Sequence, residues 1–326
     1  MERPPAKFLL KLALMALPVF AGYEMLYRLS IYPVLTASQF FDYKVLEAGR
    51  HPPGKLSLMA VGSSVTLYDL DSRVIADSLQ VPYYNFGSWG MQMTDIRAVL
   101  GGLVAAYHPC AVLICASPRE FMLPRTPSYA DYAGTAAFIR ERFPEYFYVR
   151  NFNPVHTLWL RRFRSRRPTM DAWGGASVEE MWKGVVRHDK GEQLAFPTAD
   201  TEAQYAALDS VCRYLREQHI RLVFAQAPME ARYTDSERGR RELAAFQARC
   251  GSIVGAAGGN YFNYYDTTVF PDSLFADLTH LTRAGGSILT RKIVADVKAT
   301  NELAAIIQSG KDRGQHGGTA VKGGQR

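Results

Sequence analysis

An aspartate and a histidine stand three positions apart near the end of the chain, in the phrase "ADLTHL", as Asp277 and His280. At this spacing the two side chains share one face of a helical turn, so the carboxylate can accept the Nδ1 proton of the imidazole. That contact fixes the tautomer and leaves Nε2 free to take a proton from a hydroxyl group. The pair fits a general base, while an aspartate that caps a helix beside a surface histidine is the other interpretation.

The hydroxyl group that such a base needs occurs far away in the sequence, in "MAVGSSVTLYD". An apolar run ends at Val61 and is followed by Gly62, Ser63 and Ser64. The glycine permits a tight bend after a strand, and a serine at the start of the next helix lies near backbone N–H groups that can stabilise an oxyanion. We therefore expect Ser64 to be a nucleophile with His280 as its base; a plain strand-to-helix turn is the alternative for this motif.

These residues can meet only if the elements between them form a suitable scaffold. Five apolar runs alternate with amphipathic segments, which predicts a parallel sheet covered by helices on both faces. The expected strands are 56–61, 81–87, 110–117, 221–228 and 260–268. The expected helices are 71–79, 91–107, 201–220 and 283–308. In such a sheet ligands bind beyond the carboxyl ends of the strands, where the serines and the Asp–His pair both fall.

Three short blocks, "VGSSVT", "NFGSWG" and "DLTHL", resemble in their order the SGNH (GDSL-like) hydrolase superfamily. The serine-for-aspartate form of the first block, a long middle insertion and an N-terminal membrane anchor are similar more narrowly to bacterial envelope members, the DltD-like proteins and the AlgX/AlgJ-like polysaccharide O-acetyltransferases. The resemblance covers 56–117 and 220–297. It implies a three-layer α/β/α, flavodoxin-like domain.

Carried over position by position, the resemblance implies catalytic roles for three residues. Ser64 matches the nucleophile, His280 the base and Asp277 the acid that orients the base. The backbone N–H groups of Ser64 and Gly90 match the donors that bind the oxyanion, with Gly87 as the second choice for the latter.

One block departs from the family pattern. The family's third block supplies an asparagine side chain to the oxyanion hole, but here the strand end reads "CASPREF". Ser117 or Arg119 is the candidate substitute, since losing one such donor lowers a rate by about 10²–10³-fold. Tyr68 and Trp89 lie near the same strand ends and are able to stack on a sugar ring, although ordinary packing is the alternative for each.

The resemblance implies an exported, serine-dependent O-acyltransferase or esterase that forms an acyl-enzyme and acts on acyl groups of a cell-envelope or exopolysaccharide polymer. Its implied partners are that polymer and a membrane-bound donor of the acyl group. The missing asparagine and the insertion also fit a different class of protein, a catalytically weak or inactive SGNH-like scaffold or carbohydrate-binding component of an envelope polysaccharide assembly.

The ends and the middle of the chain fall outside the alternating pattern. In residues 1–30 basic side chains precede an apolar run that is long enough to span a bilayer if its flanking charges reach back to water. We therefore expect an anchor in the bacterial inner membrane with the domain in the periplasm; a signal peptide cleaved after Ala21 and a buried core helix are the alternatives. A linker at 31–54 leads to the domain at 55–308. The domain carries an insertion at 120–197, which we interpret as a lid or substrate platform with weak helices at 135–143 and 178–186.

The remaining composition limits the partners and cofactors. The 326 residues carry a formal charge of +7, but no nucleic-acid-binding motif accompanies the basic residues, so we expect no nucleic-acid partner. A Gly- and Lys-containing tail at 309–326 is expected to be disordered. The four cysteines lack the spacing of metal ligands, so we expect no metal and no cofactor. Cys110 and Cys115 point to opposite faces of one strand and cannot pair with each other, whereas a bridge from one of them to Cys212 or Cys250 stays open.

Overall fold

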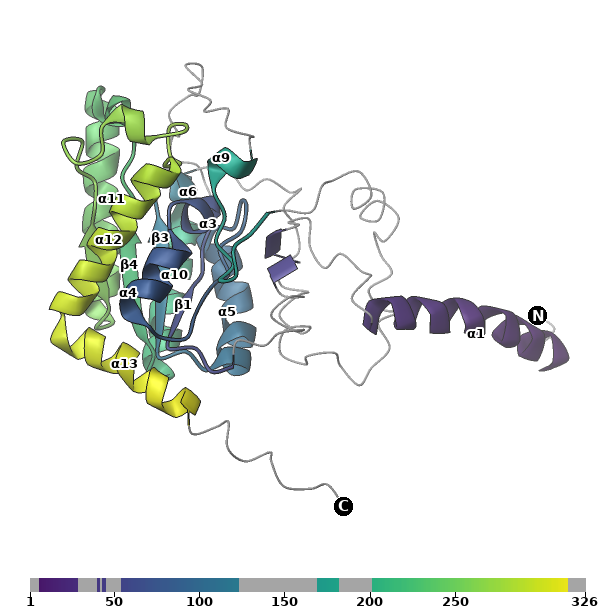
Figure 1. The fold of residues 1–326 in the computed structure, drawn as a ribbon. Helices are drawn as coiled ribbons and strands as arrows, with labels where there is room; N and C mark the ends of the chain where they lie inside the picture. Colours follow the sequence, from purple (N-terminus) through teal and green to yellow (C-terminus); the bar gives the residue numbers. More distant parts are fainter. Residues whose placement is uncertain are drawn as a thin grey trace.

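The structure, a computed structural model, describes residues 6–28, 40–41, 43–44, 54–122, 169–181 and 201–315. Figure 1 shows a central sheet with helices packed on both of its faces. The five strands are β1 (Leu58–Ala60), β2 (Tyr83–Asn85), β3 (Ala111–Ala116), β4 (Arg221–Gln226) and β5 (Asn260–Asn263). All five are parallel, in the order β2-β1-β3-β4-β5. This is the flavodoxin-like order, so the predicted parallel sheet of an α/β domain and each predicted strand are confirmed.

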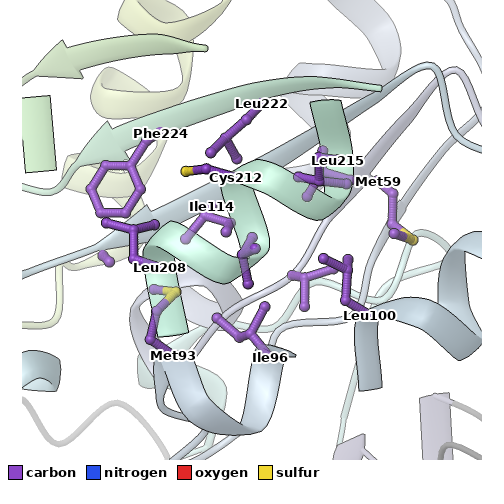
Figure 2. Packing of buried hydrophobic residues seen from close by; sticks show 14 of the residues in the cluster. Met59, Met93, Ile96, Leu100, Ile114, Leu208, Cys212, Leu215, Leu222 and Phe224 are labelled. Atoms are coloured by element: carbon purple, nitrogen blue, oxygen red, sulfur yellow. The ribbon is translucent and has the colours of Figure 1, made fainter. Parts of the chain in front are cut away.

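One core lies on the face covered by α5 (Met93–Tyr107), α10 (Thr201–Glu217) and α11 (Glu237–Ala256), and Figure 2 shows part of it. Strand β3 contributes Val112 and Ile114 to this core. Along α10 the buried apolar side chains recur at helical spacing, as Leu208, Val211, Cys212 and Leu215. That stripe explains why the segment is helical and which face it buries.

The second core lies on the opposite face, under α4 (Ser72–Leu79), α12 (Arg283–Ala299) and α13 (Asn301–Gln315). Strand β3 contributes Leu113 and Cys115 to it, because successive residues of a strand point to opposite faces. Helices therefore cover both faces of the sheet, which gives the three layers.

The four cysteines form no bridge. Cys110, Cys115, Cys212 and Cys250 are all buried and free. Cys115 packs in the second core and Cys212 in the first. The bridge that the sequence left open is therefore not formed.

The end of the chain differs from the expectation. The closing helix is broken at Thr300, whose side chain donates to the carbonyl of Asp296 at 2.9 Å, and α13 then continues to Gln315. The prediction that the tail is disordered from residue 309 is thus wrong for 309–315. Helix α13 forms because Leu303 and Ile307 are buried in the second core, a gain that outweighs the unfavourable local composition.

Of the predicted insertion at 120–197, the structure describes 120–122 and 169–181. The second piece packs along the edge of the sheet, where the N–H of Asn85 in β2 donates to the carbonyl of Trp173 at 2.8 Å. It ends in α9 (Val178–Met181), at the start of the helix predicted at 178–186. The helix predicted at 135–143 lies outside the described residues, and the lid or platform stays a prediction.

Helix α1 (Ala6–Arg28) lies apart from the sheet in Figure 1. Several of its large apolar side chains are exposed, among them Phe8 at 57% and Met15 at 76%. Within the described part of the chain, no helix combines the length and the apolar character needed to cross a bilayer. The anchor at 1–30 stays a prediction.

Candidate active site

The nucleophile candidate stands on a tight turn at the carboxyl end of β1. Ser63 caps helix α3 (Ser64–Tyr68), and its Oγ accepts the N–H of Val65 at 3.0 Å. A Cβ atom on Gly62 would overlap the side chain of Thr66, so only glycine fits this bend. Ser64 is therefore the first residue of a short helix, and it is half-buried.

Thr66 fixes this helix on the neighbouring strand. Its hydroxyl donates to the carbonyl of Cys115 at 2.7 Å and accepts the N–H of the same residue at 3.2 Å. Both partners belong to the backbone of β3 near its carboxyl end. The position of Ser64 is thus set by bonds to the sheet rather than by a free loop.

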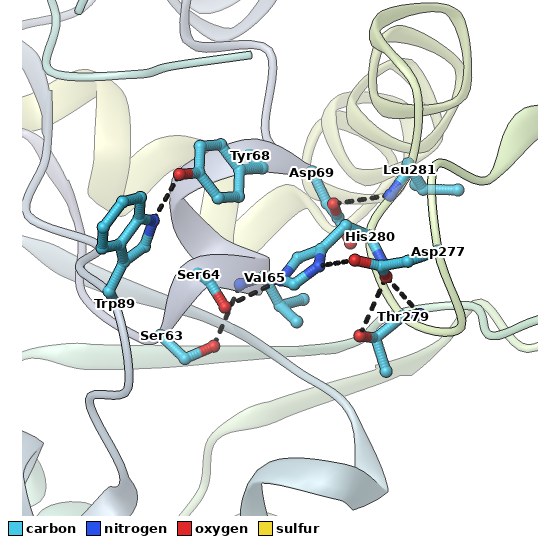
Figure 3. A network of polar contacts seen from close by, with 10 residues as sticks. All are labelled: Ser63, Ser64, Val65, Tyr68, Asp69, Trp89, Asp277, Thr279, His280 and Leu281. Carbon is cyan, nitrogen blue, oxygen red and sulfur yellow. Dashed lines mark hydrogen bonds and ion pairs between the residues drawn. The ribbon is translucent and has the colours of Figure 1, made fainter. Parts of the chain in front are cut away.

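Figure 3 shows Ser64, His280 and Asp277 joined in one chain of hydrogen bonds. The Ser64 Oγ lies 2.8 Å from His280 Nε2, and His280 Nδ1 lies 2.7 Å from Asp277 Oδ2. The structure thus brings the three predicted residues together from opposite ends of the sequence.

The Asp277–His280 segment is a bend rather than the helical turn that the spacing predicted. Asp277 Oδ1 accepts the N–H of Thr279 at 2.9 Å and that of His280 at 2.8 Å. These local bonds fold the chain back on the aspartate and compete with a regular helix. The carboxylate reaches the imidazole by this route, and helix α12 begins only at Arg283.

Burial and charge act against each other in this pair. Burial disfavours the charged form of both side chains, but their hydrogen bond and mutual attraction outweigh it. The pKa of Asp277 is held well below its usual value near 3.8, and the pKa of His280 is raised above 6.5. The site therefore stabilises an imidazolium beside Ser64, as a base that takes a proton from a hydroxyl group requires.

Two backbone N–H groups remain available to bind an oxyanion. Those of Ser64 and Gly90 have no hydrogen-bond acceptor among the described residues, and Gly90 has a φ of +62°. By contrast, the N–H of Gly87 donates to Asn85 Oδ1 at 2.7 Å. Gly87, the second choice from the sequence, is therefore already engaged, and Gly90 is the better candidate.

The third strand end holds a carboxyl group where the family pattern has an asparagine. Glu120, on α6 (Pro118–Met122), accepts the hydroxyl of Ser117 at 2.7 Å and also the Ser117 N–H and the Ser63 hydroxyl. Ser117 thus uses both of its donors on Glu120. For Arg119, on the same helix, the role of oxyanion donor stays a prediction.

Glu120 is a site residue that the sequence did not single out. Burial raises the pKa of its carboxyl group, although the bonds from Ser63 and Ser117 work in the opposite direction. Its place directly after a predicted strand was the only signal in the sequence that Glu120 lies at the site.

Aromatic side chains pack beside the base. The ring of Tyr68 meets that of His280 edge-on, with centroids 5.6 Å apart. Trp89 donates its indole N–H to the Tyr68 hydroxyl, and the ring of Phe40 lies 4.7 Å from that of Trp89. Phe40 and Tyr68 are buried in one hydrophobic cluster, so ordinary packing, the alternative from the sequence, accounts for Tyr68, while Trp89 is partly exposed against that cluster.

Comparison with known proteins gave no family model that matches the chain and no match among curated proteins. A solved structure from Bacteroides fragilis, assigned as an acylhydrolase, is 12% identical, with 79% of this chain and 96% of that chain covered at a TM-score of 0.46. The acetylxylan esterase Axe2 from Geobacillus stearothermophilus is 13% identical, with 75% and 95% covered at 0.39. A protein from Desulfitobacterium hafniense, assigned to the G-D-S-L family of lipolytic proteins, is 12% identical, with 73% and 97% covered at 0.37. Likeness at this level carries no conclusion about activity, which must follow from the site itself.

Proposed function

We propose that this chain is a serine-dependent acyl hydrolase or O-acyltransferase of SGNH type that works through an acyl-enzyme on Ser64. One observation carries the proposal: the hydroxyl, the imidazole and the carboxylate are joined by bonds of 2.8 and 2.7 Å at the carboxyl edge of the sheet. A serine that only terminated a turn would need no base, and a surface histidine would need no buried carboxylate.

In the acylation step, His280 Nε2 takes the proton of Ser64 as the Oγ attacks the carbonyl carbon of an ester or thioester. The carbonyl oxygen becomes an oxyanion, to which the N–H groups of Ser64 and Gly90 can donate. The tetrahedral intermediate then expels the alcohol or thiol, which receives its proton from His280. Asp277 stays ionised throughout and stabilises the imidazolium.

In the second step an alcohol or a water molecule attacks the acyl group on Ser64. His280 takes the proton of the incoming hydroxyl and returns one to the Ser64 Oγ as the acyl bond breaks. Water makes the protein an esterase, and a sugar hydroxyl makes it an O-acyltransferase. We propose a hydroxyl group of an envelope polysaccharide as the acceptor; the partly exposed indole of Trp89 supports this choice, since such a ring can pack against a sugar.

The test compares phosphonate labelling and ester turnover in the full chain with the same measurements in Ser64→Ala and His280→Ala. We expect both variants to lose about 10⁴-fold or more in kcat, because members of a triad act as a unit. Ser63→Ala is the matched control: it removes the neighbouring hydroxyl and a helix cap worth about 0.5–2 kcal/mol, but it keeps the nucleophile and should keep the label.

A folded wild-type chain that is neither labelled nor active would contradict the proposal and favour the non-catalytic scaffold. Label that persists in Ser64→Ala would place the nucleophile elsewhere. Adding an alcohol acceptor to the active enzyme separates the two reactions, because only a transferase forms the new ester in preference to the free acid.

A further inference from the structure

Asp69 lies outside the Ser64–His280–Asp277 triad but connects the helix that begins at Ser64 with the segment that carries His280. It caps the carboxyl end of α3, the helix that begins at Ser64, and its own N–H donates to the carbonyl of Val65 at 2.9 Å. Its side chain is fully buried, and Oδ1 accepts the N–H of Leu281 at 2.9 Å (Figure 3). Leu281 directly follows His280, so one side chain ties the nucleophile helix to the segment that presents the base.

Contacts around Asp69 also join the end of α3 to helix α12, which begins two residues after Leu281. The N–H of Asp71 donates to Thr290 Oγ1 on α12 at 2.8 Å. A Cβ atom on Gly286, also on α12, would lie 3.2 Å from the carbonyl oxygen of Asp69, so the backbones approach closely there. Among these contacts, the bond to Leu281 is the one next to His280.

Asp69 receives fewer hydrogen bonds than a buried carboxylate needs, which favours its neutral form. Its Oδ2 is buried and has no hydrogen-bond partner in the described ranges, and Oδ1 receives a single backbone donor. Asp277, which is ionised, receives two backbone donors and the imidazole. An unsatisfied charge costs far more to bury than an unsatisfied neutral group.

The titratable neighbours of Asp69 are His280, Asp277, Glu120 and the thiol of Cys115. Burial raises the pKa of Asp69 well above its usual value; the charges of Asp277 and Glu120 act in the same direction, while His280 and the Leu281 N–H oppose it. Of these groups, His280 is the one whose proton the reaction moves, so its titration can report the charge on Asp69.

We propose that Asp69 is a positioning residue for acyl transfer, which as a neutral hydrogen-bond acceptor holds the His280 backbone against the nucleophile helix. This inference rests on the proposed function for its kinetic consequence. If the bond is lost, Nε2 drifts from the Ser64 Oγ, and a displacement of about 1 Å can cost about 10²-fold in rate.

The test measures kcat, KM and the pH profile of kcat/KM for Asp69→Ala and Asp69→Asn, together with hydrogen exchange at the Leu281 amide. We expect Asp69→Ala to lower kcat about 10–100-fold with KM nearly unchanged, and to expose the Leu281 amide to exchange. Asp69→Asn keeps an acceptor oxygen, so it should retain kcat within about threefold, the protection of Leu281 and the acidic limb of the profile. Asp71→Ala, which removes a helix cap in the same loop, is the structural control and should leave kcat per folded molecule unchanged.

Three results would overturn the inference. One is a kcat for Asp69→Ala equal to that of the wild type; another is Leu281 protection that survives in this variant. The third is an Asp69→Asn variant that is as slow as Asp69→Ala, or whose acidic limb of the pH profile lies at lower pH. Either result would mean that the rate depends on the charge of Asp69 rather than on its acceptor oxygen. If Asp69→Ala does not fold, Asp69→Leu fills a similar volume without an acceptor. An inactive wild type would refute the proposed function, and the exchange of Leu281 would still decide whether Asp69 holds this segment.

Discussion

Two adjacent serines of one turn perform different tasks. The Ser63 hydroxyl caps helix α3 and donates to Glu120, whereas the Ser64 hydroxyl faces His280. The difference arises because Ser63 precedes the helix while Ser64 begins it, so their side chains leave the backbone in different directions. One residue of helix register therefore decides which of the two hydroxyl groups faces the imidazole.

The raised pKa of His280 predicts how activity depends on pH. The imidazole must be neutral to accept the Ser64 proton, so kcat/KM should rise as pH increases through a pKa above 6.5, the ordinary value. Asp277→Asn should lower kcat by about 10⁴-fold and move this limb to lower pH, because the stabilising charge is lost. A pH–rate profile of kcat/KM measures both effects, and a wild-type limb at or below 6.5 would contradict the interpretation.

His280 and Asp277 also make the free energy of unfolding depend on pH, in opposite directions. The folded chain binds the His280 proton more tightly than the unfolded chain does. The contribution of His280 to the free energy of unfolding is therefore fully present below the pKa of the unfolded chain and is lost as pH rises through the pKa of the folded chain. For Asp277, whose folded pKa is depressed, the contribution is present above the unfolded pKa and is lost as pH falls.

Among individual residues, the sequence predicted Ser64, His280 and Asp277 but not the side chains that surround them. Asp277 and His280 were recognisable because a spacing of three is a local pattern, and Ser64 because a glycine and two serines end an apolar run. Glu120 contacts Ser63 across 57 positions of the chain, and no local pattern reports such a contact.

At the scale of elements, helix α3 depends on the bend that precedes it. Gly62→Ala would place a methyl group against Thr66, whose two bonds to Cys115 fix the helix on β3. We expect this substitution to lower stability by about 1–3 kcal/mol and to reduce kcat, because Ser64 moves with the helix.

Thermal unfolding and ester turnover of the same preparation check this prediction. Gly101→Ala is the matched control, because a Cβ there has ordinary contact with Tyr214 and the residue lies inside α5. It should stabilise the protein by about 0.5–1 kcal/mol and leave kcat unchanged. If the two alanine variants behaved alike, the tight bend would not be what positions Ser64.

The strands were predicted well because buried parallel strands are continuous apolar runs bounded by polar turns. Helix α11 was missed. Its buried residues Leu243, Phe246, Cys250 and Val254 do follow helical spacing, but arginines and glycines separate them. The bend at Asp277 was mistaken for a helical turn because both geometries place residues three apart in contact, and only the bonds to Oδ1 distinguish them.

At the scale of the whole molecule, α1 predicts membrane association. Exposed apolar side chains such as Phe8, Leu12 and Met15 cover this helix, and isolated soluble proteins rarely present such a surface. We propose that it attaches the domain to lipid. The full chain should sediment with phospholipid vesicles, and a chain lacking residues 1–30 should not.

A variant lacking residues 316–326 is the control, because it removes basic charge without touching α1. It should bind vesicles as the full chain does. Equal sedimentation of the 1–30 deletion and the full chain would locate lipid binding elsewhere, and a full chain that remains in solution would refute the attachment.

The four buried thiols make the protein sensitive to oxidation whenever it unfolds. Burial raises the pKa of Cys212 to about 12 and those of Cys115 and Cys250 well above the ordinary value, so these three side chains offer almost no reactive thiolate in the folded chain. Every global opening would release all four at once, and in an oxidising compartment they would form bridges that the folded chain does not have. A bridge absent from the folded chain would hinder refolding, so in such a compartment the lifetime of the protein would be set by its rate of unfolding rather than by its free energy of unfolding.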